Sequence, residues 1–215
     1  MTRYPRWKFF LLLAVLFGCG LYALPNIFPD VPAVQISANA AGEEVPAPVR
    51  RQVAEALSAL HEATGMIHAD VKPSNILVSP EGHATLIDLG FAHSSSEGRH
   101  WSSRPVVGTL SYIAPEAITS RMSAEPSSDL YSLGVTLYEM IAGQLPFDAA
   151  SPDELVRMHR EMKPGCIRHR APRLPKTVAS LVHRLLAKDS LRRPASASDV
   201  AEELMRLEIE CFSLR

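Results

Sequence analysis

Residues 66–78 read MIHADVKPSNILV and residues 84–90 read ATLIDLG, and these two stretches decide the fold of the chain. Each contains a short apolar piece typical of a strand, and Pro80-Glu81-Gly82 between them is a turn signature. The expected hairpin carries Asp70 on the loop before it and Asp88 directly after it. Phosphoryl transfer needs this arrangement, because one carboxylate orients the attacking hydroxyl while another, with an amide oxygen, holds Mg²⁺.

The two stretches resemble the catalytic loop, HRDxKxxN, and the metal-binding motif, DFG, of protein kinases. The resemblance implies that Asp70 is the catalytic base, that Lys72 steadies the transferred phosphate and that Asn75 belongs to the catalytic set. It also implies that Asn75 and Asp88 hold magnesium, and that Leu77 lies beneath adenine. ATP and Mg²⁺ are therefore the implied cofactors, with Lys72, Asn75, Leu77 and Asp88 on the nucleotide. A lysine two places after the catalytic aspartate is the serine/threonine form of this loop.

Three later stretches resemble further kinase motifs in the family's order: GTLSYIAPE at 108–116, DLYSLGVTLYEM at 129–140 and LRRP at 191–194. By resemblance, Thr109 bonds to the catalytic aspartate and lysine. Asp129 holds the catalytic-loop backbone, and Arg193 pairs with Glu116. The implied structural supports are His68, Thr109, Glu116, Asp129 and Arg193. A chance Asp–Asn loop does not explain a series of motifs that follows the family's order. The resemblance to protein kinases covers residues 46–210.

Two positions depart from the family pattern. Ala69 stands where the family has an arginine that binds a phosphate on the activation segment, so loop phosphorylation is a less favoured on-switch. Leu89 stands where the family has phenylalanine, and an apolar side chain can pack in the same place.

The amino-terminal segment predicts a membrane anchor. Arg3, Arg6 and Lys8 precede an apolar run at residues 9–24, which we expect to form one transmembrane helix. The positive-inside rule then puts the amino terminus in the cytoplasm and the rest of the chain outside, where ATP is scarce. Two alternatives stay open: a cleaved signal peptide ending at Ala38-Asn39-Ala40, and a lipoprotein that uses Cys19.

Residues 1–40 also resemble the beginning of SecD, a membrane subunit of the bacterial protein-export machinery. The resemblance rests on RYPRWK at 3–8, LYALPN at 21–26 and PAVQI at 32–36. An Ala-, Gly-, Glu- and Pro-rich junction follows, and helical spacing of apolar residues begins at Val49 and ends near Ala63. We therefore expect a membrane anchor and extracytoplasmic linker at residues 1–42 and a kinase carboxy-terminal lobe at residues 43–215.

The sequence before Asp70 does not contain the parts of a kinase small lobe. The only lysine there is Lys8, and Gly18, Gly20, Gly42 and Gly65 form no phosphate-cradling pattern. The expected fold is thus mainly α (α+β): a kinase large lobe of two short hairpins on a helical bundle, lacking the small lobe. We expect a serine/threonine kinase-like phosphotransferase with little activity alone. Two alternatives remain, a pseudokinase or binding module, and a truncated fusion without an evolved function.

Composition limits the partners. Apolar residues make up 47% of the chain and charged residues 21%, values typical of a globular protein. A net charge of −1 gives no reason to expect nucleic-acid binding. Three cysteines without a paired spacing argue against a disulfide framework or a thiolate zinc site. The expected partners are a protein substrate, or a partner protein or lobe, and the membrane through residues 9–24.

Overall fold

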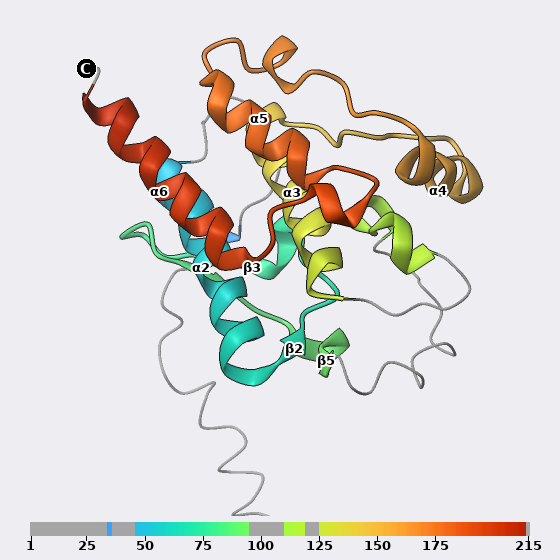
Figure 1. The fold of residues 1–215 in the computed structure, drawn as a ribbon, viewed down its shortest axis with the longest axis horizontal. Helices are drawn as coiled ribbons and strands as arrows, with labels where there is room; N and C mark the ends of the chain where they lie inside the picture. The colour runs from blue at the N-terminus through green and yellow to red at the C-terminus, as the bar shows by residue number, and fades with distance from the viewer. Residues whose placement is uncertain (1–33, 36–45, 95–109, 119–124, 214–215) are drawn as a thin grey trace, which may run out of the picture. The chain divides into compact units, whose positions relative to one another are not determined.

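The computed structural model describes residues 34–35, 46–94, 110–118 and 125–213 (Figure 1). The chain divides into two compact units after Ala33, and every described residue belongs to the second unit, Val34–Arg215. The described α-helices are α2 (Ala47–Thr64), α3 (Pro126–Ala142), α4 (Pro152–Glu161), α5 (Lys176–Leu185) and α6 (Ala197–Ser213). The strands are β1 (Val34–Gln35), β2 (Met66–Ile67), β3 (Ile76–Val78), β4 (Ala84–Leu86) and β5 (His93–Ser94). The prediction of a mainly helical fold is confirmed.

Helix α2 forms where the apolar spacing predicts a helix, and extends slightly beyond both predicted ends. Val49, Val53 and Leu57 recur on one face and are almost fully buried. The helix ends at Gly65, whose φ of 64° is the left-handed conformation that glycine adopts readily. The amide of Gly65 donates to the carbonyl of His61 at 3.0 Å, which closes the last turn. Figure 1 shows α6 running alongside α2, and the two helices pack against each other.

Helix α3 is the central helix of the unit. Twelve of its 17 residues are buried, including Asp129 near its start and Tyr131 in its second turn. It packs against α5, and the approach is close at Gly134, where an added Cβ would lie 2.7 Å from the Cβ of Leu185. Apolar side chains from α2, α3, α5 and α6 join in one core. Because α3 is buried and closely packed, it has little freedom to move.

The strands form two small sheets. Strands β3 and β4 are antiparallel, with Leu77 opposite Thr85, and Gly82 with φ 85° lies in the turn between them. Strand β1 pairs antiparallel with the other edge of β3, placing Gln35 opposite Leu77. Strands β2 and β5 pair across the catalytic loop and the first hairpin. The prediction of two hairpins is therefore half right, because β2 and β5 are separated by the whole intervening β3–β4 hairpin.

The 3₁₀ turns lie mostly where the site motifs were predicted. The segment from Pro73 to Asn75 forms η2, and the one from Leu89 to Phe91 forms η3. The remaining turns are η6 (Leu110–Tyr112), η7 (Pro115–Ile118), η8 (Ile167–His169) and η9 (Ser190–Arg192). Short turns of this kind change the chain direction within three residues and so present single side chains at defined points.

The structure contradicts the predicted single-pass membrane location with the lobe outside. In the part of the chain that the structure describes, no helix combines the length and the apolar character needed to cross a bilayer. The span expected at residues 9–24 lies outside the described residues, so no described element supports the transmembrane helix. The SecD resemblance of residues 1–40 also falls almost wholly outside them and stays a prediction, as does the domain boundary near residue 42.

Candidate active site

The backbone of the catalytic loop is held by one carboxylate from α3. The Oδ2 atom of Asp129 accepts the amide of His68 at 2.7 Å, and its Oδ1 atom accepts the amide of Ala69 at 2.8 Å. Asp129 is fully buried, so these charge-assisted bonds form away from water and are strong. A third bond runs from the Thr136 hydroxyl to the carbonyl of Val71, at 3.2 Å. The loop is thereby fastened to α3 on both sides of Asp70.

A residue that sequence reasoning missed completes this attachment. The Nε2 atom of His61, on α2, lies 2.8 Å from Oδ2 of Asp129. The buried carboxylate is thus shared between the catalytic loop and the helix that precedes it. In the sequence His61 lies on a helical face without a recognisable motif, and only its position in the fold indicates its role.

The three residues expected to be catalytic lie together. Asp70 is 2% exposed, and its Oδ2 atom is 2.7 Å from Nζ of Lys72 and 2.9 Å from Nδ2 of Asn75. Asn75 also donates to the carbonyl of Asp70, at 2.9 Å. The Oδ1 atom of Asp70 is buried and has no hydrogen-bond partner among the described residues. One oxygen of this carboxylate is therefore fixed by protein donors, while the other is buried and makes no hydrogen bond with the described residues.

The segment that ends at Asp88 is tied to the same loop. The amide of Ile87 donates to the carbonyl of Asn75 at 2.9 Å, and Nε2 of His68 bonds to the carbonyl of Ile87 at 3.1 Å. The amide and the carbonyl of Ile87 are thus both hydrogen-bonded to the catalytic loop. These bonds fix the position of the backbone that leads into Asp88, close to Asn75. The Oδ1 atom of Asp88 accepts the amide of Gly90 at 3.1 Å. A Cβ at position 90 would lie 3.0 Å from that oxygen, so a larger residue there would displace the Asp88 carboxylate by a few tenths of an ångström.

Backbone strain is concentrated in this site. Among the described residues, the non-glycine residues with positive φ are Ala69 at 61° and Asp88 at 67°. Such conformations cost about 1–3 kcal/mol each and persist only where surrounding contacts enforce them. Ala69 directly precedes Asp70, and Asp88 is itself one of the residues that the kinase resemblance singles out.

The donor set around Asn75 and Asp88 suits a hard divalent cation. Amide and carboxylate oxygens are the ligands that Mg²⁺ prefers, and protein Mg²⁺ sites commonly use one or two carboxylates with phosphate oxygens and water. Nδ2 of Asn75 is engaged by Asp70, which leaves its amide oxygen for a metal. The described residues contain no group of three or more His, Cys, Asp or Glu side chains placed for a metal. A metal held by Asn75 and Asp88 would therefore take its remaining ligands from water or from nucleotide phosphates.

Leu77 is half-buried on β3, next to the turn that carries Asn75. Thr109, expected to bond to Asp70 and Lys72, lies outside the described residues.

Glu116 and Arg193, expected to pair, form a bidentate ion pair. Oε1 of Glu116 lies 2.6 Å from Nη1 of Arg193, and Oε2 lies 2.8 Å from Nη2. Ser128 on α3 donates to the same carboxylate at 2.9 Å, another contact that the sequence did not indicate. Burial alone would raise the pKa of Glu116, but the guanidinium of Arg193 outweighs it and holds that pKa below its usual value.

A second carboxylate, Glu139 on α3, binds the end of the activation segment. The hydroxyl of Tyr112 donates to Oε2 of Glu139 at 2.5 Å, and Ser132 donates to the carbonyl of Tyr112 at 2.8 Å. Burial raises the pKa of Glu139, although the Tyr112 hydrogen bond opposes that shift. These bonds, together with the one from Ser128, fasten residues 112–116 to α3, so the same helix supports the activation segment and the catalytic loop.

Comparison with known proteins agrees with this geometry. The family model for "Protein kinase domain" matches residues 35–206. The chain is 35% identical over 159 residues to a probable serine/threonine-protein kinase, pknA2, of Bifidobacterium longum, covering 73% of this chain and 21% of that protein. It is 37% identical over 165 residues to the serine/threonine-protein kinase pkn2 of Myxococcus xanthus, covering 73% and 20%. It is 27% identical over 156 residues to the serine/threonine-protein kinase PrkC of Bacillus subtilis, covering 73% and 24%.

The chain thus spans about a fifth to a quarter of the length of these three relatives. The match covers residues 66–78 and 84–90, which contain the β3–β4 hairpin, and the α3 motif that supports them. The chain belongs to the protein kinase domain family.

Proposed function

We propose that this chain supplies the catalytic lobe of an ATP- and Mg²⁺-dependent serine/threonine protein kinase. The observation that carries the proposal is the Asp70 carboxylate, which has one oxygen held by Lys72 and Asn75 and the other buried without a described partner. A general base needs such an acceptor within hydrogen-bond reach of the hydroxyl that attacks.

Each side chain of the site has a distinct part in this proposal. Oδ1 of Asp70 accepts and orients the substrate serine or threonine hydroxyl, and takes its proton as the phosphate is transferred. Nζ of Lys72, now 2.7 Å from Asp70, neutralises charge on the transferred phosphate. Asn75 and Asp88 hold Mg²⁺ through their oxygens, and Leu77 contacts the adenine. When bound, Mg²⁺ would neutralise charge on the nucleotide phosphates.

We propose further that phosphate transfer requires a small lobe supplied from outside residues 1–215. Residues 1–69 contain one lysine, Lys8, so they offer no cation of the kind that clamps the nucleotide phosphates. Two apolar side chains just after Asp88 are also exposed: Leu89 is 52% exposed and Phe91 is 37% exposed. Apolar side chains exposed beside a catalytic loop are the kind of surface that another protein element covers.

Nucleotide binding is the first test. We expect Mg-ATP to raise the melting temperature of the full chain, and Asp88→Asn to abolish most of that rise because a metal ligand loses its charge. Asp153→Asn, on the exposed start of α4, is the matched control and should keep the rise. An equal rise in melting temperature in all three proteins would contradict the metal role of Asp88. If the folded wild type shows no rise, the chain does not bind Mg-ATP and the proposal fails.

Phosphate transfer in trans is the second test. The full chain is mixed with a separately produced small lobe from one of the relatives, and transfer of labelled γ-phosphate to a serine-containing protein is followed. We expect transfer only in the mixture, and a loss of at least roughly 10³-fold in Asp70→Asn. Transfer that survives Asp70→Asn would show that another protein carries the activity.

A binding module is the second candidate function, because the exposed Leu89 and Phe91 could hold a partner without catalysis. A stable partner that binds equally to the wild type, Asp70→Asn and Asp88→Asn would favour that function. The third reading, a fusion without evolved function, predicts a chain that stays insoluble with every partner.

A further inference from the structure

A basic loop joins α4 to α5 and takes no part in the proposed catalysis. We define it as residues 163–176, which contain five lysines or arginines and one histidine. No aspartate or glutamate occurs anywhere from residue 162 to residue 188, although the whole chain has 23 acidic residues against 22 basic ones. The near-neutral net charge therefore hides a local concentration of positive charge.

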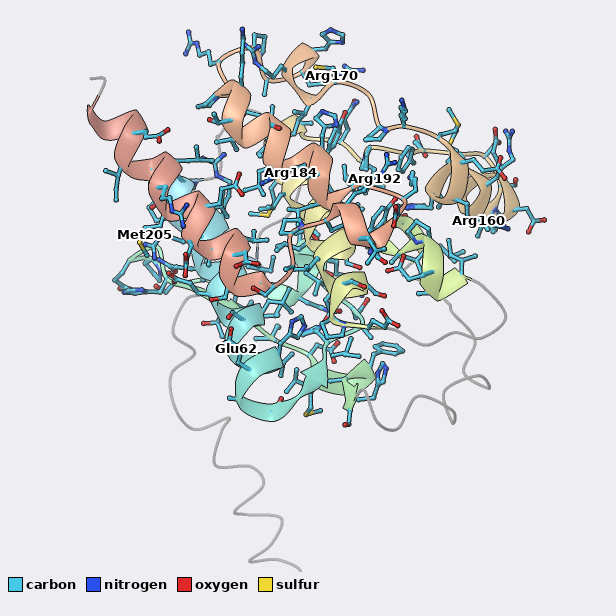
Figure 2. The ribbon with its side chains drawn as sticks, viewed as in Figure 1. Glu62, Arg160, Arg170, Arg184, Arg192 and Met205 are labelled. Atoms are coloured by element: carbon cyan, nitrogen blue, oxygen red, sulfur yellow. The ribbon has the colours of Figure 1, made fainter. Side chains whose placement is uncertain are left out.

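Most of this charge faces solvent. The exposed basic side chains of the loop are Lys163, His169, Arg170, Arg173 and Lys176. None of these five forms an ion pair within the described part of the chain, in contrast to Arg184, Arg192 and Arg206, which pair with Glu203, Asp189 and Glu202. Figure 2 shows Arg170 at the outer edge of the segment between α4 and α5. Like charges without counter-charges create a local field that attracts an anionic partner.

The loop backbone is held in one shape. Arg168 folds back, donating from Nε to the carbonyl of Leu174 at 3.0 Å and from Nη2 to the carbonyl of Pro172 at 3.4 Å. Ile167 and Leu174 are buried and anchor the loop to the core, at 0% and 7% exposed. The amide of Ile167 also donates to Nε2 of His183 at 3.4 Å. A loop that is already ordered loses less conformational entropy when it binds a partner.

The chemistry of the loop favours a protein partner. It contains no phenylalanine, tyrosine or tryptophan on which a nucleobase could stack. Its larger apolar side chains, Ile167 and Leu174, are buried, so it has no apolar anchor for a lipid bilayer. What remains is a set of guanidinium and ammonium groups, which pair with carboxylates in defined geometry.

We propose that the basic loop is a docking site for an acidic, Asp- or Glu-rich segment of a protein partner. In Figure 1 the loop runs along the edge of the unit opposite to β2 and β5, away from the start of the catalytic loop. A segment docked there would lie away from the start of the catalytic loop, which carries Asp70. The site thus fits a substrate or regulatory protein that is held at one place and acts, or is acted on, at another.

The test uses a fluorescein-labelled deca-glutamate peptide and the full chain, with binding followed by fluorescence anisotropy. Arg170→Glu/Arg173→Glu should weaken binding roughly tenfold or more, because two attractive charges become repulsive. Arg192→Glu/Arg206→Glu changes the net charge equally at exposed sites elsewhere and should leave the affinity within about twofold. Raising the salt from about 50 to 200 mM should also weaken binding to the wild type. Circular dichroism checks that both variants are folded.

Several outcomes would overturn the proposal. If deca-glutamate does not bind to the folded wild type, the docking proposal is wrong. If both double variants weaken binding equally, the net charge of the chain and not the basic loop accounts for the binding. A deca-thymidine oligonucleotide, a peptide with two phosphoserines or phosphatidylglycerol vesicles serve as competing ligands. If one of them binds more tightly than deca-glutamate and loses that affinity in Arg170→Glu/Arg173→Glu, the partner is not a carboxylate-rich protein segment.

Discussion

At the scale of single residues, the catalytic loop is shaped by a strained backbone that its surroundings enforce. Ala69 holds a φ of 61° while its amide is bound by the buried Asp129. The side chain of Ala69 is exposed, so its Cβ contributes steric cost without packing. The geometry of Asp70, the next residue, depends on this conformation.

Ala69→Gly should therefore raise the free energy of unfolding by about 0.5–1 kcal/mol, since glycine adopts positive φ without a steric penalty. Ala59→Gly, at an exposed position in the middle of α2, is the control and should lower it by about 1 kcal/mol. Urea denaturation of the three proteins measures both changes. A loss of stability in Ala69→Gly equal to that in the control would mean that the loop does not hold position 69 in the left-handed region.

His159 is a second residue whose environment has a measurable consequence. It is fully buried on α4, and its Nδ1 atom lies 3.0 Å from the hydroxyl of Tyr131, which also accepts a hydrogen bond from Lys188. Burial, reinforced by the charge of Lys188, lowers the pKa of His159 to about 4. A neutral imidazole accepts the Tyr131 hydrogen bond, whereas the protonated ring cannot.

The sign of the pH effect follows from that shift. The unfolded chain binds a proton at His159 near pH 6.5 and the folded chain only near pH 4, so stability is lost as the pH falls through this window. The loss from this residue should approach about 3 kcal/mol at pH 4. Denaturation midpoints of the wild type and His159→Gln between pH 7 and pH 4.5 test it, because the variant lacks the titrating group. Parallel curves for the two proteins would rule out His159 as the source.

At the scale of elements, the fit between α3 and α5 depends on a glycine. The Cβ of any other residue at position 134 would lie 2.7 Å from the Cβ of Leu185 and 3.2 Å from its backbone carbon. Both atoms are fixed by the backbone of α5, so they cannot move aside as the far end of a flexible side chain can.

Gly134→Ala should lower the free energy of unfolding by about 1–3 kcal/mol through overpacking. Gly165→Ala is a matched control, because the nearest atom to its Cβ would be the Tyr138 hydroxyl oxygen at 3.6 Å, an ordinary contact. Thermal denaturation of both variants compares them. If Gly134→Ala proves as mild as the control, α3 and α5 can separate at low cost.

The elements differ in how far the sequence predicts them. Helix α2 was predictable because its apolar residues recur with helical spacing, and the β3–β4 hairpin because two short apolar pieces lie on either side of a turn signature. The β2–β5 pair was not, since Met66 and Ser94 meet only after the hairpin between them has folded. His61 and Ser128 make contacts of the same kind: each is an ordinary polar residue on a helix until folding brings Asp129 beside His61 and Glu116 beside Ser128. Local patterns predict elements and motif residues, whereas long-range polar contacts depend on tertiary packing.

At the scale of the whole molecule, one ion pair joins distant parts of the chain. Glu116 lies at the end of the activation segment, and Arg193 lies just before α6, 77 residues later. The Arg193 side chain is fully buried and also donates to the carbonyls of Ser127 and Ala187. Its guanidinium thus links the activation segment, the start of α3 and the end of α5 in one polar cluster.

Removing either partner should leave a charge without its counter-charge in a largely buried site. We expect Arg193→Met and Glu116→Gln each to lower the free energy of unfolding by about 3 kcal/mol or more. The double variant should cost clearly less than the sum of the two, because no unpaired charge then remains. Arg192→Met is the control: its side chain is 81% exposed and 3.6 Å from Asp189, so its loss should cost under about 0.5 kcal/mol. Urea denaturation of the four variants completes the cycle, and strict additivity of the two single changes would mean that Glu116 and Arg193 stabilise the lobe independently.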